Sequence, residues 1–238
     1  IISTELPKAL EYGVTFDASE INGFMNIGES DLLLKPDPST AEILPWRPQQ
    51  DRVLRIFCDI CYPDGRTFEG DSRNILKRSV DCLKELGYSC DIGSECKFYL
   101  FELDEYGNPT NKPHDNGTYY DVAPVDKGEN IRREICLTLE EMGIQPESSY
   151  HQAGPGQHEI VFKYGAPVEA ADHLMTFKNL VKTIAHMNGL FASFMPKPLQ
   201  RQNGNGIFVN LSLYDTDGNS VIDYNNAVSY THLRAHET

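Results

Sequence analysis

The first candidate site is a pair of opposite charges inside an otherwise small or apolar run. Residues 93–101 read GSECKFYLF, and Glu95 and Lys97 lie two positions apart in it. If the run is a strand, both side chains point to the same face of the sheet. An acid and a base on one half-buried face are either a plain ion pair or part of a binding site. This stretch alone leaves both interpretations open.

Two further stretches carry polar groups beside glycine-rich turns. Residues 149–160 (SYHQAGPGQHEI) place Glu159 and two histidines around a Gly-Pro-Gly turn. Residues 201–214 (RQNGNGIFVNLSLY) place Asn210 and Ser212 on one face of a strand that follows a glycine-rich loop. Taken singly, a histidine near a glutamate more often marks a structural hydrogen-bonded pair than a ligand, and NGNG more often marks a loop than a site.

Short strands and three helices are expected to position these residues. Apolar residues at helical spacing, each run followed by a glycine, predict helices over residues 72–86, 128–142 and 168–187. Asp71 or Ser72 can cap the first of them. Apolar runs predict strands over residues 52–60, 93–103, 158–164 and 206–214. No glycine-rich phosphate loop joins a strand to a helix, so we expect an α+β fold with a largely antiparallel sheet.

Composition excludes several classes of function. The chain has 238 residues, enough for one large domain or two smaller ones, and its formal net charge is -14. A surface this acidic repels phosphate backbones, so nucleic acid is not an expected partner. The sequence shows no signal peptide and no apolar run near the roughly 20 residues that a bilayer requires, so neither secretion nor membrane insertion is expected.

The cysteines are a weaker signal. Cys58 and Cys61 form a CxxC spacing, which is found in redox pairs and in half-sites for zinc. No second CxxC and no histidine pair accompanies it, and a chain of this length does not need disulfides to fold. The six cysteines are therefore interpreted as reduced thiols of a cytosolic protein, some of them packed in the interior.

Taken together, five motifs resemble one family in order and spacing. FDASEINGF and PDGRTFEGDSRNILKR come first, then GSECKF, YHQAGPGQHEIVFKY and FMPKPLQRQNGNGIFVNLSL. From Leu6 to about Asn226 they resemble glutamine synthetase of the bacterial type I kind, and the second motif follows the family's pattern almost letter for letter.

The resemblance implies a domain order. Residues 1–66 are expected to be the C-terminal portion of a small β-rich, β-grasp-like domain. Residues 67–228 are expected to be the N-terminal portion of the catalytic domain, with a mainly antiparallel sheet flanked by helices. Residues 229–238 do not look like the family, and we interpret them as a foreign or misread tail. The family's first strands and its long C-terminal part are expected outside this chain.

The resemblance also implies an activity: ATP phosphorylates the glutamate γ-carboxylate, and ammonia then displaces phosphate from γ-glutamyl phosphate. Divalent Mg²⁺ or Mn²⁺ neutralises the gathered negative charge. By motif position Glu95 and Glu159 are metal ligands, and Asp17, reaching a neighbouring subunit's site, helps to deprotonate ammonium. Contacts to the glutamate substrate are implied for Asn203 and Gly204. Contacts to ATP are implied for Glu147, Tyr164, Asn210 and Ser212. A cytoplasmic homo-oligomer, a ring dodecamer, is implied as well.

The departures from the family fall on the metal ligands. Lys97 stands where the motif has a second glutamate, Gln152 where it has another, and Phe208 where it has a histidine. These changes remove anions and introduce a cation, so they argue against full metal occupancy. One interpretation is a working ligase, for ammonia or for another amine or acid, with a rearranged metal site. A second is a catalytically impaired paralogue with a regulatory or structural role. A third, an acidic binding domain without ligase chemistry, conflicts with the match of the nucleotide-side residues.

Overall fold

The computed structural model describes residues 1–21, 30–47, 50 and 52–222, in two compact units that divide between Gly87 and Tyr88. The last three residues of the motif at 16–24 and the predicted tail at 229–238 lie outside the described residues. Within the described part of the chain, no helix is both long and apolar enough to span a bilayer.

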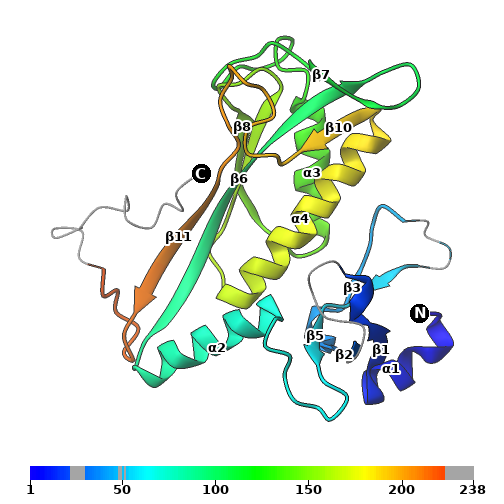
Figure 1. Cartoon of the computed structure of the whole chain (residues 1–238). Coiled ribbons are helices and arrows are strands. Elements are labelled where there is room, and N and C mark those ends of the chain that lie inside the picture. Colours follow the sequence, from blue (N-terminus) through cyan, green and yellow to red (C-terminus); the bar gives the residue numbers. More distant parts are fainter. Residues whose placement is uncertain (22–29, 48–49, 51, 223–238) are drawn as a thin grey trace. The chain divides into compact units, whose positions relative to one another are not determined.

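The first unit is built on a small antiparallel sheet (Figure 1). Its strand order is β1 (Val14–Asp17), β2 (Asp31–Pro36) and β5 (Cys58–Cys61). Two short strands, β3 (Glu42–Ile43) and β4 (Leu54–Arg55), form a separate two-stranded sheet. Helix α1 covers Leu6–Tyr12, and single 3₁₀ turns cover Ser3–Glu5, Ala18–Glu20 and Pro38–Thr40. A small apolar core of Ala18, Leu32 and Phe68 holds the unit together.

Helix α2 (Ser72–Glu85) closes the first unit and is held to β5 by charge. Asp71 caps it by accepting the backbone N–H of Arg73 at 3.1 Å, as one of the two predicted caps would. Two cations of its first turns, Arg73 and Lys77, pair with Asp59 of β5 at 2.7 and 2.6 Å. The helix therefore begins where the capping signal predicted.

The single strand predicted over residues 52–60 is wrong. Leu54–Arg55 form β4 and pair with β3, whereas Cys58–Cys61 form β5 and pair with β2. The chain changes sheets at Phe57, whose backbone N–H donates to Thr40 Oγ1 and whose carbonyl accepts from Asp37. The apolar run is continuous in the sequence, but its two halves form backbone hydrogen bonds with strands of two different sheets.

The second unit is an antiparallel sheet organised around one long strand, β6 (Ser89–Leu103) (Figure 1). The order β10–β6–β9–β8 comprises β10 (Leu190–Ser193), β9 (Gln157–Phe162) and β8 (Pro146–His151). Two further strands, β7 (Pro109–Pro113) and β11 (Ile207–Tyr214), also pair with β6. The predicted α+β fold with a mainly antiparallel sheet is confirmed. Strand β6 begins earlier than predicted because β11 pairs with it as far back as Ser89.

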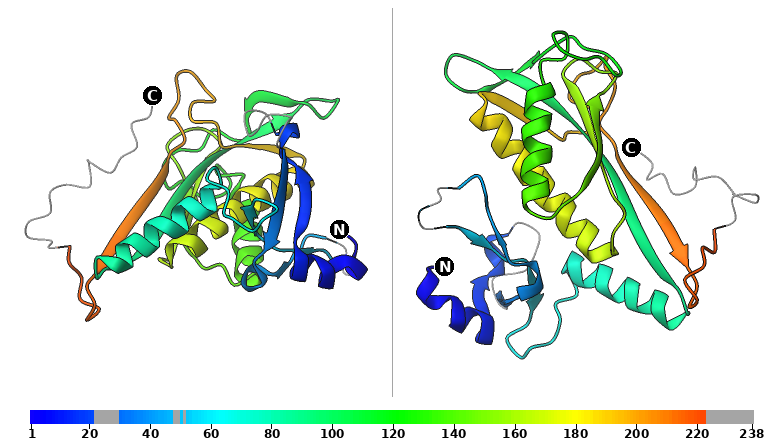
Figure 2. Two further views of the ribbon diagram at one scale, coloured as in Figure 1. Left: turned by 60° about the horizontal axis from the view of Figure 1, so that its bottom comes forward. Right: turned by 180° about the vertical axis from the view of Figure 1, so that it is seen from behind.

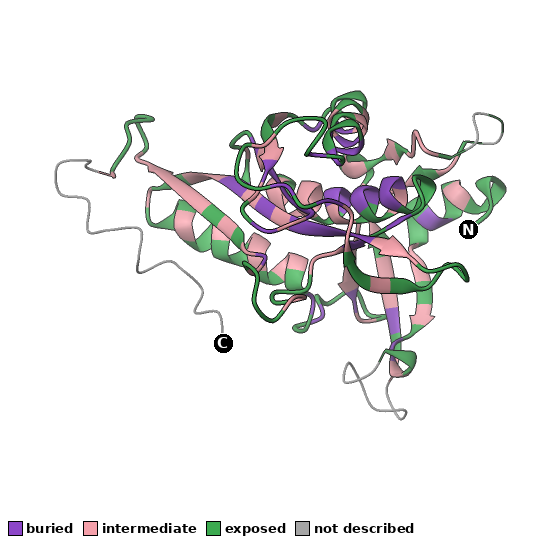
Figure 3. Cartoon of the chain, turned by 90° about the horizontal axis from the view of Figure 1, so that it is seen from above, coloured by how far each residue is buried: buried purple, intermediate pink, exposed green. Residues whose placement is uncertain are grey.

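Two helices cover one face of this sheet, as the view from behind shows (Figure 2). Helix α3 (Glu129–Glu141) packs on β8, and α4 (Pro167–Met187) packs on β10 and β6. Phe98 of β6 and Phe177 of α4 are fully buried between them, with ring centroids 6.0 Å apart. The buried positions in Figure 3 follow β6 and the sheet-facing side of α4. Because Phe98 faces the helices, its neighbour Lys97 faces the other side of the sheet.

Candidate functional site

Three adjacent strands bring the predicted metal-site positions onto the sheet face opposite the helices. In the β6–β9 ladder Lys97 lies directly opposite Glu159, and in the β6–β11 ladder Glu95 lies opposite Phe208. Residues directly opposite in antiparallel strands project to the same face with their Cβ atoms about 5 Å apart. The register therefore gathers on one surface residues that are more than 100 positions apart in the chain.

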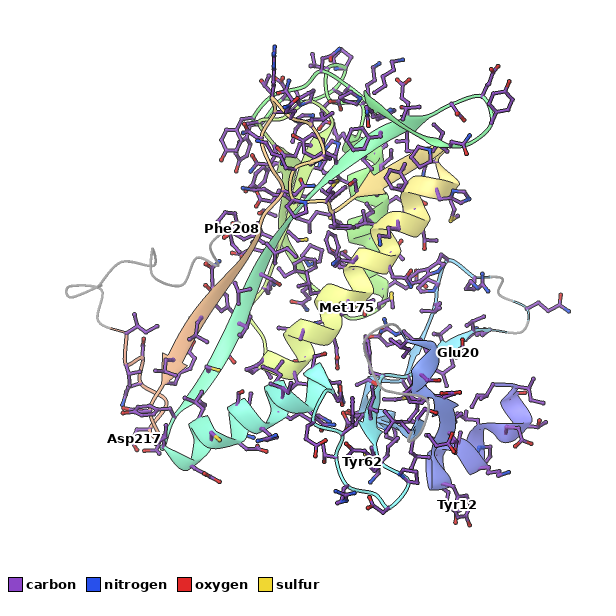
Figure 4. All side chains as sticks on the ribbon, viewed as in Figure 1. Tyr12, Glu20, Tyr62, Met175, Phe208 and Asp217 are labelled. Carbon is purple, nitrogen blue, oxygen red and sulfur yellow. The ribbon has the colours of Figure 1, made fainter. Side chains whose placement is uncertain are left out.

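Lys97 makes contacts to both neighbouring strands. Its Nζ lies 4.0 Å from Glu159 Oε1 and 4.6 Å from the centroid of the Phe208 ring. Phe208, labelled in Figure 4, stands near the start of β11, where that strand runs beside β6. The Glu159 side chain is 2% exposed and that of Lys97 is 19% exposed. The ammonium is thus held between a buried carboxylate and an aromatic face, an arrangement that stabilises a cation.

Amides donate to one oxygen of each of the two glutamates on this face. Gln152 Nε2 donates a hydrogen bond to Glu159 Oε2. Asn210 Nδ2 donates to Glu95 Oε1 at 2.9 Å. Glu159 Oε1 is buried and has no hydrogen-bond partner among the residues that the structure describes, so Lys97 supplies its counter-charge.

A divalent cation does not fit this set of donors. Mg²⁺ requires near-octahedral oxygen ligands, and Mn²⁺ likewise favours oxygen-rich sites. Here two carboxylates remain, an ammonium lies against one of them, and an apolar ring stands beside them. The amide of Gln152 donates to the carboxylate that a metal would need. Glu95 and Glu159 lie on the predicted face, but the groups around them stabilise the Lys97 ammonium and not a metal ion.

The predicted nucleotide-side residues are partly brought together. Asn210 and Ser212 share a face of β11, opposite Gly93 and Asp91 of β6. Gly93 has no side chain, and a Cβ there would lie 2.7 Å from the Tyr164 ring, so the glycine lets Tyr164 cover β6. Tyr164 also lines a cavity of about 190 Å³ that neither Asn210 nor Ser212 lines. Glu147 is exposed on edge strand β8 at a register irregularity.

The predicted glutamate-binding loop is more firmly held than its glycines suggest. Asn203 accepts, through its carbonyl, the hydroxyl of Tyr99 at 2.5 Å. The Gly204 carbonyl accepts Nε2 of the fully buried Gln157 at 2.9 Å. Asn205 accepts from the same Nε2 and donates to the carbonyls of Ser193 and Met195.

Sequence reasoning missed Tyr99, Gln157 and Asn205 as the residues that position this loop. The available signal was polar side chains inside strand-like or glycine-rich segments. Such groups need hydrogen-bond partners when they are buried.

Three tyrosines beside Glu159 were also missed. Tyr150 lies directly opposite Glu159 in the β8–β9 ladder, and its ring stacks on Tyr120 with centroids 4.6 Å apart. Tyr119 meets the Tyr150 ring edge-on at 5.9 Å. Burial first, and the adjacent Glu159 carboxylate second, raise the pKa of the Tyr150 phenol. The phenol therefore stays protonated at neutral pH beside that carboxylate.

The two histidines of the 149–160 stretch point to the helix side of the sheet, away from Lys97. His151 Nε2 lies 2.8 Å from Asp115 Oδ1, and His158 Nδ1 lies 2.9 Å from Arg132 Nη1. Arg132 also pairs with Asp126 at 2.7 Å. The four buried His and Asp side chains have ligand atoms within 4.8 Å of one another, as a metal site would.

The Arg132 guanidinium already contacts two members of that group, so the hydrogen-bonded structural pair favoured by the single motif is the better description. Burial opposes ionisation of Asp115. The hydrogen bonds from His151 and from two backbone N–H groups outweigh burial and lower the pKa of Asp115. Burial, reinforced by Arg132, lowers the pKa of His158 well below its ordinary value.

Asp17 belongs to the first unit and lies at the end of β1. Its carboxylate accepts the backbone N–H and the hydroxyl of Ser19 at 2.9 and 2.7 Å. These hydrogen bonds lower its pKa, the Ser19 hydroxyl most. Its predicted role in a neighbouring subunit's site stays a prediction.

The CxxC residues, Cys58 and Cys61, lie on β5 opposite Pro36 and Leu33 of β2, and all six cysteines are free thiols. Burial raises the pKa of both thiols of the CxxC. A raised pKa disfavours the thiolate that redox chemistry and zinc binding require.

Comparison with known proteins gives one family throughout. Residues 1–63 match the family described as the glutamine synthetase β-grasp domain, and residues 69–236 match the glutamine synthetase catalytic domain. A glutamine synthetase from Clostridium saccharobutylicum is 50% identical over 94% of this chain and 51% of its own. That from Methanosarcina mazei is 48% identical over 93% of this chain and 49% of its own. The domain boundaries predicted at residues 66 and 228 stay predictions.

Solved structures agree with the sequences. A GmaS/ADP complex superposes with a TM-score of 0.84 at 27% identity, covering 94% of this chain and 51% of that one. A Plasmodium falciparum glutamine synthetase gives 0.80 at 29% identity, covering 95% and 48%. The chain spans about half the length of the curated relatives it matches. With a β-grasp match, a catalytic-domain match and a strand face that carries the family's motifs, the chain belongs to the glutamine synthetase family.

Proposed function

We propose that the intact protein is an ATP-dependent ligase that joins ammonia to L-glutamate through γ-glutamyl phosphate, in nitrogen assimilation. The observation that carries the proposal is the shared face of β6, β9 and β11, on which Glu95, Glu159, Asn210 and Ser212 project from strands of matching register. The ADP bound by the structurally similar GmaS supports a nucleotide ligand for this scaffold.

Within this proposal each side chain has a definite task. Asn203 and Gly204 hold the amino acid substrate, and their loop is fixed by Gln157 and Tyr99. Glu147, Tyr164, Asn210 and Ser212 line the nucleotide side. Asp17 attracts ammonium, because the hydrogen bonds that lower its pKa keep its carboxylate ionised; it accepts a proton from the nitrogen as the new C–N bond makes those N–H groups acidic. The substrates are glutamate, ammonia and ATP, and the assembly is a cytoplasmic homo-oligomeric ring.

Mg²⁺ or Mn²⁺ is the family's expected companion of ATP, but the donor set of this chain does not fit it. Protein cations would then have to offset the charge on the phosphates, and Lys97, a cation of this face, already pairs with Glu159.

One set of contacts favours a second candidate, a catalytically impaired paralogue with a regulatory or structural role. Lys97, Gln152 and Phe208 replace three ligands at once, and they form a self-consistent cluster. Loss of transition-state charge stabilisation lowers phosphoryl-transfer rates by orders of magnitude. A ligase for another amine or acid remains compatible with the same face.

The test is glutamine formation by the intact protein from ATP, glutamate and ammonium, with Mg²⁺ and with Mn²⁺. Turnover within about tenfold of an ordinary family member supports the ligase and rejects the impaired paralogue. Calorimetry of ATP binding with and without Mg²⁺ separates them further. Strict metal dependence supports the working ligase, and metal-independent binding favours the impaired paralogue.

A further inference from the structure

We infer that Lys97 is a built-in counter-ion that takes the place of a divalent cation, so that Glu95 and Glu159 do not form a divalent-metal site in this protein. The inference deepens the proposed function by describing the same strand face. It requires only the family's strand register, not a working ligase.

Without Lys97, the negative charge of the buried Glu159 carboxylate would have no counter-charge on the neighbouring strand. Glu159 is 2% exposed and its Oε1 accepts no hydrogen bond from any described residue. Gln152 donates to the other oxygen, but a neutral amide does not cancel the charge of a buried carboxylate, so a cation next to it is strongly favourable. Lys97 Nζ, 4.0 Å away on the neighbouring strand, is that cation.

The strand register and the Phe208 ring hold the Lys97 ammonium in place. Lys97 lies directly across from Glu159 in the ladder, and its Nζ lies 4.6 Å from the Phe208 ring centroid. An aromatic face attracts a cation but offers no lone pair to a metal. Phe208 therefore favours the ammonium over a metal ion.

Amides also bind one oxygen of each glutamate. Gln152 and Asn210 donate N–H groups to Glu159 and Glu95, respectively. Each of these bonds uses a lone pair of the oxygen that accepts it and makes that oxygen a weaker metal ligand. Lys97, Phe208 and the two amides thus act in the same direction, toward a site that is neutralised by the protein itself.

The test is Mn²⁺ titration of the intact protein by calorimetry and by electron paramagnetic resonance, with no nucleotide present. In each background the site is defined by the difference that Glu159→Gln makes. In the wild type we expect E159Q to leave Mn²⁺ binding unchanged. In the triple variant Lys97→Glu, Gln152→Glu, Phe208→His we expect a new Mn²⁺ site, weakened about 10- to 100-fold or more when Glu159→Gln is added.

Two further variants keep the test decisive. Lys97→Met alone removes the ammonium while keeping the side-chain length, and should raise Mn²⁺ affinity even if the triple variant does not fold. Lys163→Glu makes the same net charge change as Lys97→Glu beyond the end of β9, and should create no site. A wild-type Mn²⁺ site that disappears in E159Q overturns the inference. Folded K97M and triple variants that gain no Mn²⁺ affinity also overturn it.

These outcomes are independent of catalysis. Glutamine formation without an E159Q-sensitive Mn²⁺ site would support both the ligase and the counter-ion. An E159Q-sensitive Mn²⁺ site in a protein without ligase activity would refute the counter-ion role of Lys97. The missing activity would then need a cause other than loss of the metal site.

Discussion

The ion pair between Lys97 and Glu159 predicts a measurable coupling in stability. At the observed 4.0 Å separation, an effective dielectric constant of about 20 gives an attraction of about 4 kcal/mol. Removing one partner of a buried pair typically costs about 3–5 kcal/mol. Lys97 is 19% exposed, so water screens part of this, and we expect Lys97→Met to lower the unfolding free energy by about 2–3 kcal/mol.

The assay is a double-mutant cycle with Lys97→Met and Glu159→Gln, followed by denaturant unfolding of the intact protein at one protein concentration. The double variant should be less destabilised than the sum of the single variants by about 2 kcal/mol, because removing both charges leaves neither one buried alone. Lys178→Met is the matched control. Its ammonium also lies over a ring, 5.6 Å from the Phe194 centroid, so its loss estimates the aromatic part, about 1 kcal/mol or less. Costs that add to within about 0.5 kcal/mol would refute the counter-ion role of Lys97.

Three further predictions concern packing and hydrogen bonding elsewhere in the second unit. Gly128→Ala should lower the midpoint of thermal unfolding by several degrees, because the added Cβ would lie 2.5 Å from His158 Nε2. Gly165→Ala is the control and should shift the midpoint little, because the atom nearest to its Cβ would be 3.6 Å away. Equal shifts in the two variants would contradict the steric explanation. Gln157→Leu should speed hydrogen exchange of the 201–206 segment by about tenfold or more, since it removes two hydrogen bonds to the loop, and unchanged exchange by mass spectrometry would argue against the clamp. Asp115→Asn should lower the unfolding midpoint, because the lowered pKa of Asp115 in the folded state stabilises the wild type above the ordinary Asp pKa of about 4. The difference between wild type and variant should be full near pH 6 and should shrink as the pH falls below about 4. A difference that grows toward acid pH would show that the folded-state pKa of Asp115 is not lowered.

Local signals predicted three of the four described α-helices well and missed α1 (Leu6–Tyr12). Helices α2, α3 and α4 lie within one or two residues of their predicted bounds. Caps and end glycines act within a few residues, so they are readable in the sequence: Asp71 caps α2, and Gly87 and Gly143 adopt positive φ just after α2 and α3. The run at 52–60 failed because its apolar pattern does not state which strand it pairs with.

The sequence by itself determined that Glu95 and Lys97 share a strand face, because side chains alternate with a period of two. It also indicated the family, through motifs at fixed spacing, and predicted that three of the family's metal-ligand positions are changed here. Which partners those replacements would meet was beyond it.

Only the tertiary structure decided that Lys97 lies opposite Glu159, that Phe208 offers its ring to the same ammonium, and that Gln152 and Asn210 cover the carboxylates. The pairing register joins residues that are 58 to 125 positions apart in the chain, and a slip of one residue would turn these side chains to the other face. The same register places the histidines of β8 and β9 on the helix side, where they pair with Asp115 and Arg132. Charge type was written in the chain, but which charges neutralise one another depends on the register of the folded sheet.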